Sequence, residues 1–256
     1  MSKHFEIAPL VGCFLVVLAG VQAVPEGRIM NGVDALKGQF PHQISLRKNG
    51  FHLCGGSIIS RNYVLTAAHC VGIFNKNGTF SVFNPKIFTV YAGSVNRFKN
   101  GVIIPVAALI PHKKYGNFCN DIALVKLAKP LKFSKLIQRI DLMPPASYRQ
   151  ALLVTGWGRT STNGPKPANM QWTIIWSMST AACKEVVGDD ADKLICLKPL
   201  KKYGTCTFDS GGPAIDEVGR LVGLDSYRMG TCEDNKPRVY TNVYCHIHWI
   251  KEHSDL

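Results

Sequence analysis

The chain has 256 residues, of which 46% are hydrophobic, 23 are glycine and 14 are proline. This apolar content excludes a disordered chain, and the many turn-forming residues are typical of a packed β protein. The formal net charge is +13, which indicates a basic surface that favours anionic partners.

Residues 10–21 form an apolar run that follows Lys3 and His4 and precedes a small-residue cleavage pattern ending at Ala23. This arrangement predicts a secretory signal peptide over residues 1–23, and therefore a secreted, extracellular protein. A membrane anchor is disfavoured, because the run is shorter than the ~20 residues that cross a bilayer and no other long apolar segment follows. We expect no membrane span.

The chain has nine cysteines, of which Cys13 lies in the signal peptide. The others are even in number, which suits four disulfides in an oxidising compartment. No C-x-x-C spacing occurs, and His246 and His248 are two apart, so they would face different sides of a helix. We therefore predict no metal site and no cofactor.

Residues 35–120 contain no aspartate or glutamate. They hold ten basic residues: Lys37, Arg47, Lys48, Arg61, Lys76, Lys86, Arg97, Lys99, Lys113 and Lys114. One interpretation is a solvated basic face that aids solubility. The other is a surface that binds sulfated glycans, anionic membranes or acidic protein segments. Secretion argues against nucleic acid as a partner.

Short apolar or alternating runs, separated by Gly, Pro and Asn, follow the signal peptide. They are residues 42–47, 57–68, 86–93, 102–110, 121–127, 151–158, 170–178 and 220–227. Their length and spacing predict antiparallel strands in a sandwich or barrel. Residues 128–150 fit this pattern less well, so we predict that they connect two lobes. Val243, Ile247 and Ile250 recur at helical spacing and predict a C-terminal helix.

Three short motifs occur in a fixed order: TAAHC with His69, NDIAL with Asp121 and DSGGP with Ser210. A serine hydroxyl is a weak nucleophile and needs an imidazole to accept its proton. The imidazole in turn needs a carboxylate to fix its tautomer. Each motif alone has an ordinary structural explanation, but the three together on a secreted, β-rich chain indicate nucleophilic catalysis by serine.

These motifs, with CGGSIIS from Cys54, TGWG at residues 155–158 and VYTNV at residues 239–243, resemble the trypsin/chymotrypsin (S1-type) serine proteases. The resemblance covers residues 29–256, which we expect to form one protease domain. It implies an all-β fold of two antiparallel six-stranded β-barrels with a C-terminal α-helix. It also implies a protein substrate, with His69 as general base, Asp121 as its orienting group and Ser210 as nucleophile. We expect a monomer.

The resemblance further implies that residues 24–28 are an activation propeptide. A trypsin-like protease would cut after Arg28, and the freed amine of Ile29 would then pair with Asp209. Before cleavage, the resemblance implies that Asp209 hydrogen-bonds His52 and, through it, Ser45. Ordinary strand packing is the alternative role for Ser45 and His52.

The resemblance implies three disulfides: Cys54–Cys70, Cys183–Cys196 and Cys206–Cys232. Cys119 and Cys245 remain, and we predict a fourth bridge between them. Asn77-Gly78-Thr79 is a sequon in a loop-like stretch, so we predict a glycan on Asn77. The carboxylates that the family's calcium loop needs are missing from this stretch, so calcium is not expected.

Phe208 departs from the family, which has a glycine at this position. The resemblance assigns the oxyanion hole to the backbone N–H groups of Phe208 and Ser210. A side chain leaves these donors in place. It crowds the leaving-group side, however, and disfavours the unusual dihedral angles that glycine tolerates. We therefore expect Phe208 to lower the rate of turnover without necessarily abolishing it.

The substrate-binding pocket departs further. The resemblance assigns its floor to Gly204, so the aspartate of a tryptic pocket is absent, and its walls to Ser226, Arg228 and Arg238. We expect Asp225 to pair with Arg238, because a buried guanidinium needs a carboxylate or an anion. Three outcomes stay open: Arg238 binds acidic side chains, the arginines fill the pocket, or Arg228 points to solvent and small side chains enter.

The sequence thus predicts a secreted, zymogen-activated serine endopeptidase of restricted, non-tryptic specificity, for acidic or small residues before the scissile bond. The alternative is a catalytically weak or inactive homologue that acts as a secreted binding protein or inhibitor through its basic surface. The three motifs and the retained Arg28-Ile29 favour the enzyme. Phe208, the two pocket arginines and the net charge favour the binding protein.

Overall fold

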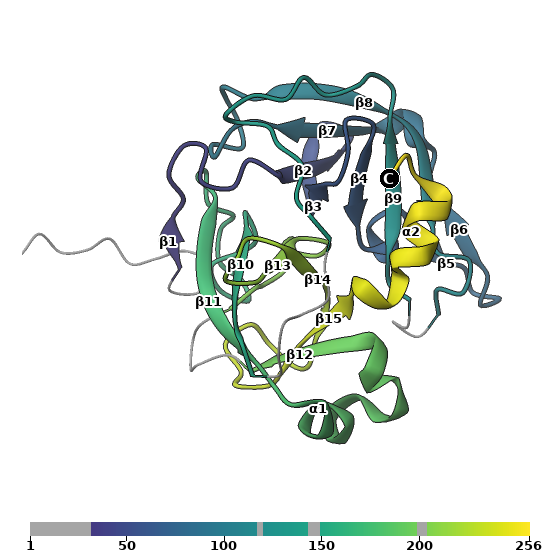
Figure 1. The fold of residues 1–256 in the computed structure, drawn as a ribbon, viewed down its shortest axis with the longest axis vertical. Helices are drawn as coiled ribbons and strands as arrows, with labels where there is room; N and C mark the ends of the chain where they lie inside the picture. The colour runs from purple at the N-terminus through teal and green to yellow at the C-terminus, as the bar shows by residue number, and fades with distance from the viewer. Residues whose placement is uncertain (1–31, 117–119, 143–148, 199–203) are drawn as a thin grey trace, which may run out of the picture.

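Two β-barrels pack against one another in the structure, a computed structural model that describes residues 32–116, 120–142, 149–198 and 204–256 (Figure 1). The first barrel is closed, in the strand order β2-β3-β4-β9-β8-β7. Its strands are β2 (Gln43–Lys48), β3 (Phe51–Ile58), β4 (Tyr63–Thr66), β7 (Phe88–Ala92), β8 (Val102–Pro111) and β9 (Ala123–Leu127). All of their pairings are antiparallel.

The second barrel has the strand order β11-β10-β13-β14-β15-β12, and a β11–β12 pairing closes it. Its strands are β10 (Ala151–Gly156), β11 (Gln171–Ser177), β12 (Leu194–Lys198), β13 (Pro213–Ile215), β14 (Leu221–Arg228) and β15 (Arg238–Asn242), and β1 (Val33–Asp34) extends β11 at its edge. The predicted fold is confirmed. The predicted connection, residues 128–150, falls between β9, the last strand of the first barrel, and β10, the first of the six strands of the second; its residues 143–148 lie outside the described residues.

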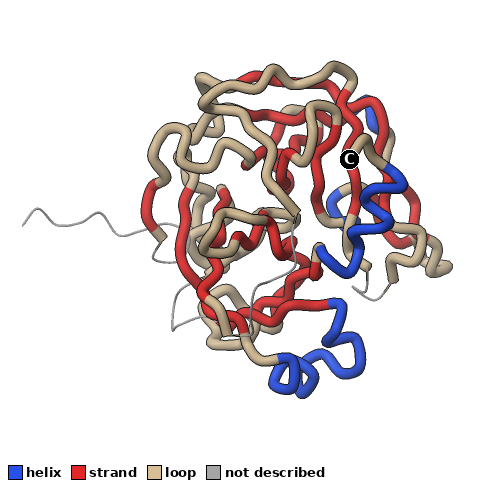
Figure 2. Tube along the Cα trace, viewed as in Figure 1, coloured by secondary structure: helices blue, strands red, loops and turns tan. Residues whose placement is uncertain are grey.

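In the described residues, the helices are short segments outside the barrel strands (Figure 2). The predicted C-terminal helix is α2 (Ile247–His253), preceded by a 3-10 turn over Tyr244–His246. A second helix, α1 (Thr180–Val187), was not predicted. Its start is marked by Ser179, whose side chain accepts a hydrogen bond from the backbone N–H of Ala182, and its end by Gly188 with a φ of 73°.

Strand β9 contributes side chains to two separate hydrophobic clusters, one on each of its faces. Ala123 and Val125 face the core of the first barrel. Leu124, between them, belongs to a separate cluster that also contains Leu65, Leu221 and Ile250. Because successive side chains of a strand point to opposite faces, residues 123–125 of β9 are covered on both sides and are all apolar, whereas Lys126 is exposed. The second cluster joins both barrels and α2, and it fixes the barrels relative to one another.

The two glycine-rich motifs meet where the barrels touch. The Gly55 backbone N–H donates to the Ser210 carbonyl at 2.8 Å. A Cβ atom on Gly55 would lie 2.8 Å from the Cα of Gly212, which is closer than real side chains approach. The CGG and SGG sequences are therefore required by a backbone-to-backbone contact that brings Ser210 to the edge of the first barrel.

The structure contains three disulfides, Cys54–Cys70, Cys183–Cys196 and Cys206–Cys232, as the resemblance implies. Cys245 is exposed and has no disulfide partner among the described residues, and its Sγ lies 3.1 Å from the Asp192 carbonyl oxygen. Its predicted partner, Cys119, lies outside the described residues, so the fourth bridge stays a prediction. Within the described residues, no helix is long and apolar enough to cross a bilayer.

The inter-barrel cluster makes a stability prediction. Leu124 is fully buried there, so Leu124→Ala should lower the free energy of unfolding by about 2–5 kcal/mol, through lost burial and the cavity it leaves. Val218 is 66% exposed, and Val218→Ala should change the free energy by less than about 0.5 kcal/mol. Urea unfolding of both variants with disulfides intact measures this, and equal effects would contradict the assigned role of the cluster.

Candidate active site

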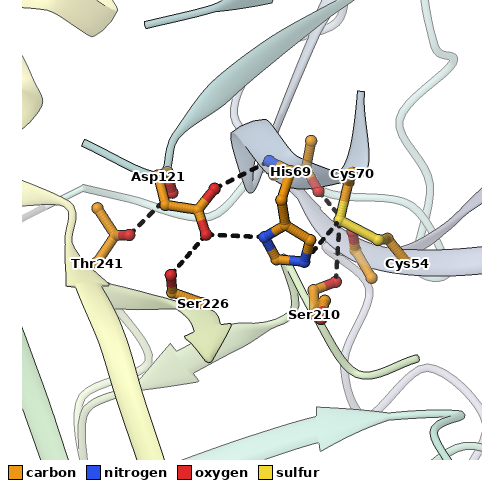
Figure 3. A network of polar contacts seen from close by, with 9 residues as sticks. Cys54, His69, Cys70, Asp121, Ser210, Ser226 and Thr241 are labelled. Carbon is orange, nitrogen blue, oxygen red and sulfur yellow. Dashed lines mark hydrogen bonds and ion pairs between the residues drawn. A yellow bond between two sulfur atoms is a disulfide. The ribbon is translucent and has the colours of Figure 1, made fainter. Parts of the chain in front are cut away.

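The half-buried His69 and the fully buried Asp121 form a pair at the junction of the barrels (Figure 3). His69 lies on a 3-10 turn, Ala68–Cys70, directly after β4. Its Nδ1 is 2.8 Å from Asp121 Oδ2, and its backbone N–H donates to Asp121 Oδ1 at 3.0 Å. Both carboxylate oxygens are therefore bonded to one residue, which fixes the plane of the imidazole and leaves Nε2 facing away from Asp121.

The second barrel completes the surroundings of Asp121. Ser226, on β14, donates its hydroxyl to Asp121 Oδ2 at 2.5 Å. Thr241, on β15, donates its hydroxyl to the Asp121 carbonyl at 2.8 Å. Ser226 was predicted from the sequence as a substrate-binding residue, whereas Thr241 was missed because nothing in its sequence context marks a hydroxyl that reaches across a domain interface.

The electrostatic surroundings make the His69 imidazole more basic than a free histidine. Burial alone lowers the pKa of His69. The charge of Asp121, its hydrogen bond and the charge of Asp225 raise the pKa, and the net shift is upward from 6.5. A histidine with a raised pKa and a fixed tautomer is suited to accept a proton from a hydroxyl group.

Ser210 lies beside the free edge of this imidazole (Figure 3). Its carbonyl accepts from Gly55 and lies 3.7 Å from Cys70 Sγ, which is also 3.7 Å from His69 Nε2. Among the described residues, no hydrogen bond joins the Ser210 hydroxyl to His69. Catalytic hydrogen bonds commonly tighten only when the substrate is bound, so this arrangement is compatible with general-base catalysis.

The backbone around Ser210 leaves two N–H groups free. The N–H groups of Asp209, Gly211 and Gly212 donate to backbone carbonyls of the second barrel and its loops. Those of Phe208 and Ser210 donate to no group in the described part of the chain. They are the two donors that the resemblance assigns to an oxyanion hole. Unused donors beside a nucleophile can stabilise negative charge that develops on a carbonyl oxygen.

Phe208 has a φ of 81°, the left-handed conformation that favours glycine. Its carbonyl accepts from His52 Nε2 at 3.0 Å, and its ring lies 4.0 Å from Lys166 Nζ. A non-glycine residue in this region costs on the order of 1–3 kcal/mol and needs surrounding contacts to hold it. The phenylalanine therefore keeps the backbone conformation of glycine at the expense of some stability.

His52 has a different partner from the one implied by the resemblance. Its Nδ1 is 2.8 Å from Ser45 Oγ, as implied, but its Nε2 donates to the Phe208 carbonyl and not to Asp209. Burial lowers the pKa of His52 to about 3, so the ring is neutral. The structure thus places Ser45 and His52 as a support for the Phe208 peptide, and the implied His52–Asp209 bond is absent here.

Asp209 is a buried carboxylate without a cationic partner in the described residues. It accepts from the backbone N–H groups of Gly158 at 2.7 Å and Cys206 at 2.9 Å. Burial raises the pKa of Asp209 to about 7, against the effect of these two hydrogen bonds. A Cβ atom on Gly158 would collide with the carboxylate, which explains the glycine in TGWG. Arg28 and Ile29 lie outside the described residues.

Arg238, assigned to the pocket wall, is fully buried. It donates to the carbonyls of Thr231, at 3.2 Å, and Cys232. The expected ion pair with Asp225 is wrong: no salt bridge joins these side chains, and the Asp225 carboxylate takes a hydrogen bond from Thr205 instead. Burial raises the pKa of Asp225 to about 6, partly offset by Thr205 and the nearby charge of Arg238. Two backbone carbonyls, and not the Asp225 carboxylate, are the hydrogen-bond partners of the guanidinium.

Arg228 lies opposite Arg238 on the neighbouring strand. Its guanidinium donates to the Thr207 hydroxyl at 3.2 Å. This bond connects β14 with the loop that carries Ser210. The Nε atoms of both arginines are buried and have no hydrogen-bond partner among the described residues. The three outcomes that the sequence left open for this pocket stay open.

A groove of about 500 Å³ adjoins His69 on its other side. Its walls come largely from the hairpin β5 (Gly72–Phe74) and β6 (Phe80–Val82), and its lining includes Phe74, Phe80, Tyr115 and Lys48. Asn77 lies at the exposed turn of this hairpin. Its side-chain oxygen accepts from the Thr79 hydroxyl at 2.7 Å, and the predicted glycan stays a prediction.

Comparisons with known proteins agree with this geometry. Residues 29–250 match the family model described as Trypsin. The chain is 38% identical to Serine protease SP24D of Anopheles gambiae over 227 residues, which covers 88% of this chain and 80% of that protein. It is 35% identical to Chymotrypsin-2 of Vespa crabro over 228 residues, covering 88% and 99% respectively.

Among solved structures, mouse neuropsin, described as a serine protease, superimposes with a TM-score of 0.75. The sequences are 26% identical, and the match covers 86% of this chain and 97% of that chain. The match includes both barrels and thus the fold that carries His69, Asp121 and Ser210. The chain therefore belongs to the trypsin family of serine proteases.

Proposed function

We propose that the chain is a secreted, zymogen-activated serine endopeptidase of restricted, non-tryptic specificity. The observation that carries this proposal is the constellation of the His69–Asp121 pair, the adjacent Ser210 and the two free N–H groups of Phe208 and Ser210. Each of the groups that acyl transfer requires is present: a nucleophile, a base with raised pKa, an orienting carboxylate and oxyanion donors.

In the proposed mechanism, His69 Nε2 takes the proton of Ser210 Oγ as the oxygen attacks the scissile carbonyl carbon. The carbonyl oxygen gains the negative charge and accepts from the N–H groups of Phe208 and Ser210. His69 then gives its proton to the leaving amine as the carbon–nitrogen bond breaks. Water repeats the sequence on the acyl-enzyme, which releases the acid and restores Ser210.

Specificity follows from the two arginines. Arg238 donates to two backbone carbonyls, whereas Arg228 makes one hydrogen bond, to the Thr207 hydroxyl. The Nε of each arginine is buried without a hydrogen-bond partner in the described residues. A second cation or a long neutral side chain would have to displace these groups. A carboxylate would offer Arg228 the missing partner, and a small side chain would leave the arginines undisturbed. We therefore propose acidic or small residues before the scissile bond.

Activation is proposed to depend on Asp209. A carboxylate whose pKa burial raises to about 7 is poorly stabilised as an anion. The amine of Ile29, freed by cleavage after Arg28 by a trypsin-like protease, would supply the missing charge. Secretion through residues 1–23 belongs to the same proposal and gives access to such a protease.

A second candidate function is a secreted binding protein with little turnover. The occupied space around Arg228 and Arg238 and the net charge of +13 favour it. The free oxyanion donors disfavour it, because a binding protein has no need to leave N–H groups unpaired beside a serine.

Peptide cleavage separates these functions. The protein processed after Arg28 should cut a proteome-derived peptide library, and Ser210→Ala should abolish the cuts. Acidic or small residues should precede the cut bonds, and Arg228→Gly should broaden the preference toward larger neutral residues. Identical digests from the two proteins would overturn the endopeptidase. Cuts after lysine or arginine would overturn the specificity.

The raised pKa of His69 makes a separate prediction. His69 must be neutral to act as a base, so kcat/KM should fall on the acid side with a midpoint above 6.5. Asp121→Asn removes the charge that opposes burial, so the NMR titration of His69 should shift to lower pH, and turnover should fall by about 10⁴. The exposed Asp189 offers the control Asp189→Asn, which should leave the titration unchanged. An unchanged or higher midpoint in Asp121→Asn would contradict the assignment.

A further inference from the structure

The positions of Ser210 and His69 indicate on which side of the active site the leaving group of a substrate departs. The resemblance assigns the acyl part of the substrate to the pocket of Ser226 and Arg228, on β14. The Cys54–Cys70 disulfide lies beside the nucleophile and the base, with Cys70 Sγ 3.7 Å from both the Ser210 carbonyl oxygen and His69 Nε2. The leaving amine must be within reach of His69, so we take the side of this disulfide, where the resemblance also puts Phe208, as the leaving-group side.

Two cations stand over Phe208 on this side. Lys166 Nζ lies 4.0 Å from the centre of the Phe208 ring and 3.5 Å from the His52 carbonyl oxygen. The Arg159 guanidinium lies 5.7 Å from the centre of the same ring. Both side chains are half-buried. They are thus recessed beside Ser210 and do not extend freely into solvent.

Two further arginines hold the loop that carries Lys166. Arg97 donates from Nε to the Pro167 carbonyl at 2.8 Å and from its backbone N–H to the Ala168 carbonyl at 2.9 Å. Arg47 donates to the Arg97 carbonyl, and its guanidinium lies 3.8 Å from the centre of the Tyr91 ring. These hydrogen bonds hold the backbone of the loop on either side of Lys166. The position of the Lys166 side chain is therefore set by contacts within the protein.

The four positive charges are close enough to repel one another. Burial lowers the pKa of Lys166 first, and the charges of Arg97 and Arg159 lower it further. Burial and the charge of Arg47 lower the pKa of Arg97 in the same way. In the described ranges, none of these four side chains forms a salt bridge.

Among the described residues, no acid forms a salt bridge with this cluster. The sequence has no aspartate or glutamate at residues 35–120 or 142–184. The acids that contact the loop do so elsewhere: Glu233 accepts from the Thr162 N–H at 2.7 Å, and Asp34 accepts from the Asn169 side chain at 3.2 Å. The described part of the chain thus leaves this cluster without a counter-charge, and an anionic group of another molecule could supply one.

We propose that Lys166 and Arg159 select substrates with an acidic side chain among the first residues after the scissile bond. This inference rests on the proposed function, because it assumes a peptide bound at Ser210. The Phe208 ring supplies an apolar floor for the methylene groups of a glutamate, and the two cations bind its carboxylate. A peptide is favoured over a sulfated glycan because both cations are recessed beside Ser210, whereas a polyanion needs an exposed row of charges.

The test compares matched peptides with glutamate or glutamine at each of the first three positions after the scissile bond. The processed enzyme should cleave the best glutamate peptide with a kcat/KM about three- to tenfold above its glutamine counterpart at low salt. In the double variant Lys166→Gln and Arg159→Gln, this ratio should fall to about one. Lys86 is exposed and remote, so Lys86→Gln should keep the ratio and the absolute rates.

A binding arm distinguishes failure of this inference from failure of the endopeptidase. Peptides that mimic the leaving group are titrated against the Ser210→Ala protein by fluorescence anisotropy, with and without the two glutamine substitutions. Glutamate-dependent binding that needs Lys166 and Arg159 supports the inference even where no variant cleaves. A ratio near one for the wild type, or a ratio that survives the double substitution, overturns it. A double variant that loses only heparin binding overturns it in favour of a glycan.

Discussion

The buried carboxylate of Asp121 is the interaction on which the rest of the site depends. Transferring a charge from water into a protein interior is costly unless hydrogen bonds or an opposite charge compensate it. Here the compensation comes from both barrels: two N–H groups of His69 on the first and the hydroxyl of Ser226 on the second, while Thr241 holds the carbonyl. Satisfying one charge therefore aligns the barrels and orients the imidazole toward Ser210.

The loop of Ser210 is held by a second set of constraints. Asp209 bonds two backbone N–H groups, Gly55 and Gly212 allow the backbones to touch, and His52 holds the Phe208 carbonyl. Together these contacts turn two N–H groups outward, unpaired, in the described structure. Phe208 accommodates a conformation suited to glycine, so the substitution changes what lies beside the nucleophile more than the path of the backbone. The Phe208 ring, with the Lys166 ammonium group over its face, would then contact the part of the substrate that leaves.

The sequence was sufficient for features that depend on chain order and strong local patterns. The alternating runs predicted the strands, the three motifs predicted which residues meet, and the resemblance implied the three disulfides that the structure contains. Features decided by tertiary contacts were not predictable in the same way. Whether Arg238 would bond Asp225 or nearby carbonyls depends on side-chain reach within a few ångströms. Thr241 and the bracing of Lys166 by Arg97 join segments far apart in the chain, with no local signal.

The central claim is that Ser210 is an activated nucleophile despite Phe208. The most direct measurement is labelling of the processed protein with a small alkyl fluorophosphonate, followed by mass spectrometry, because this reagent needs the base and the oxyanion donors but no specificity pocket. The account predicts one adduct, on Ser210, which is lost in His69→Ala. A processed, folded protein that forms no adduct on Ser210 would contradict the account, and the basic surface would become the first place to look for its function.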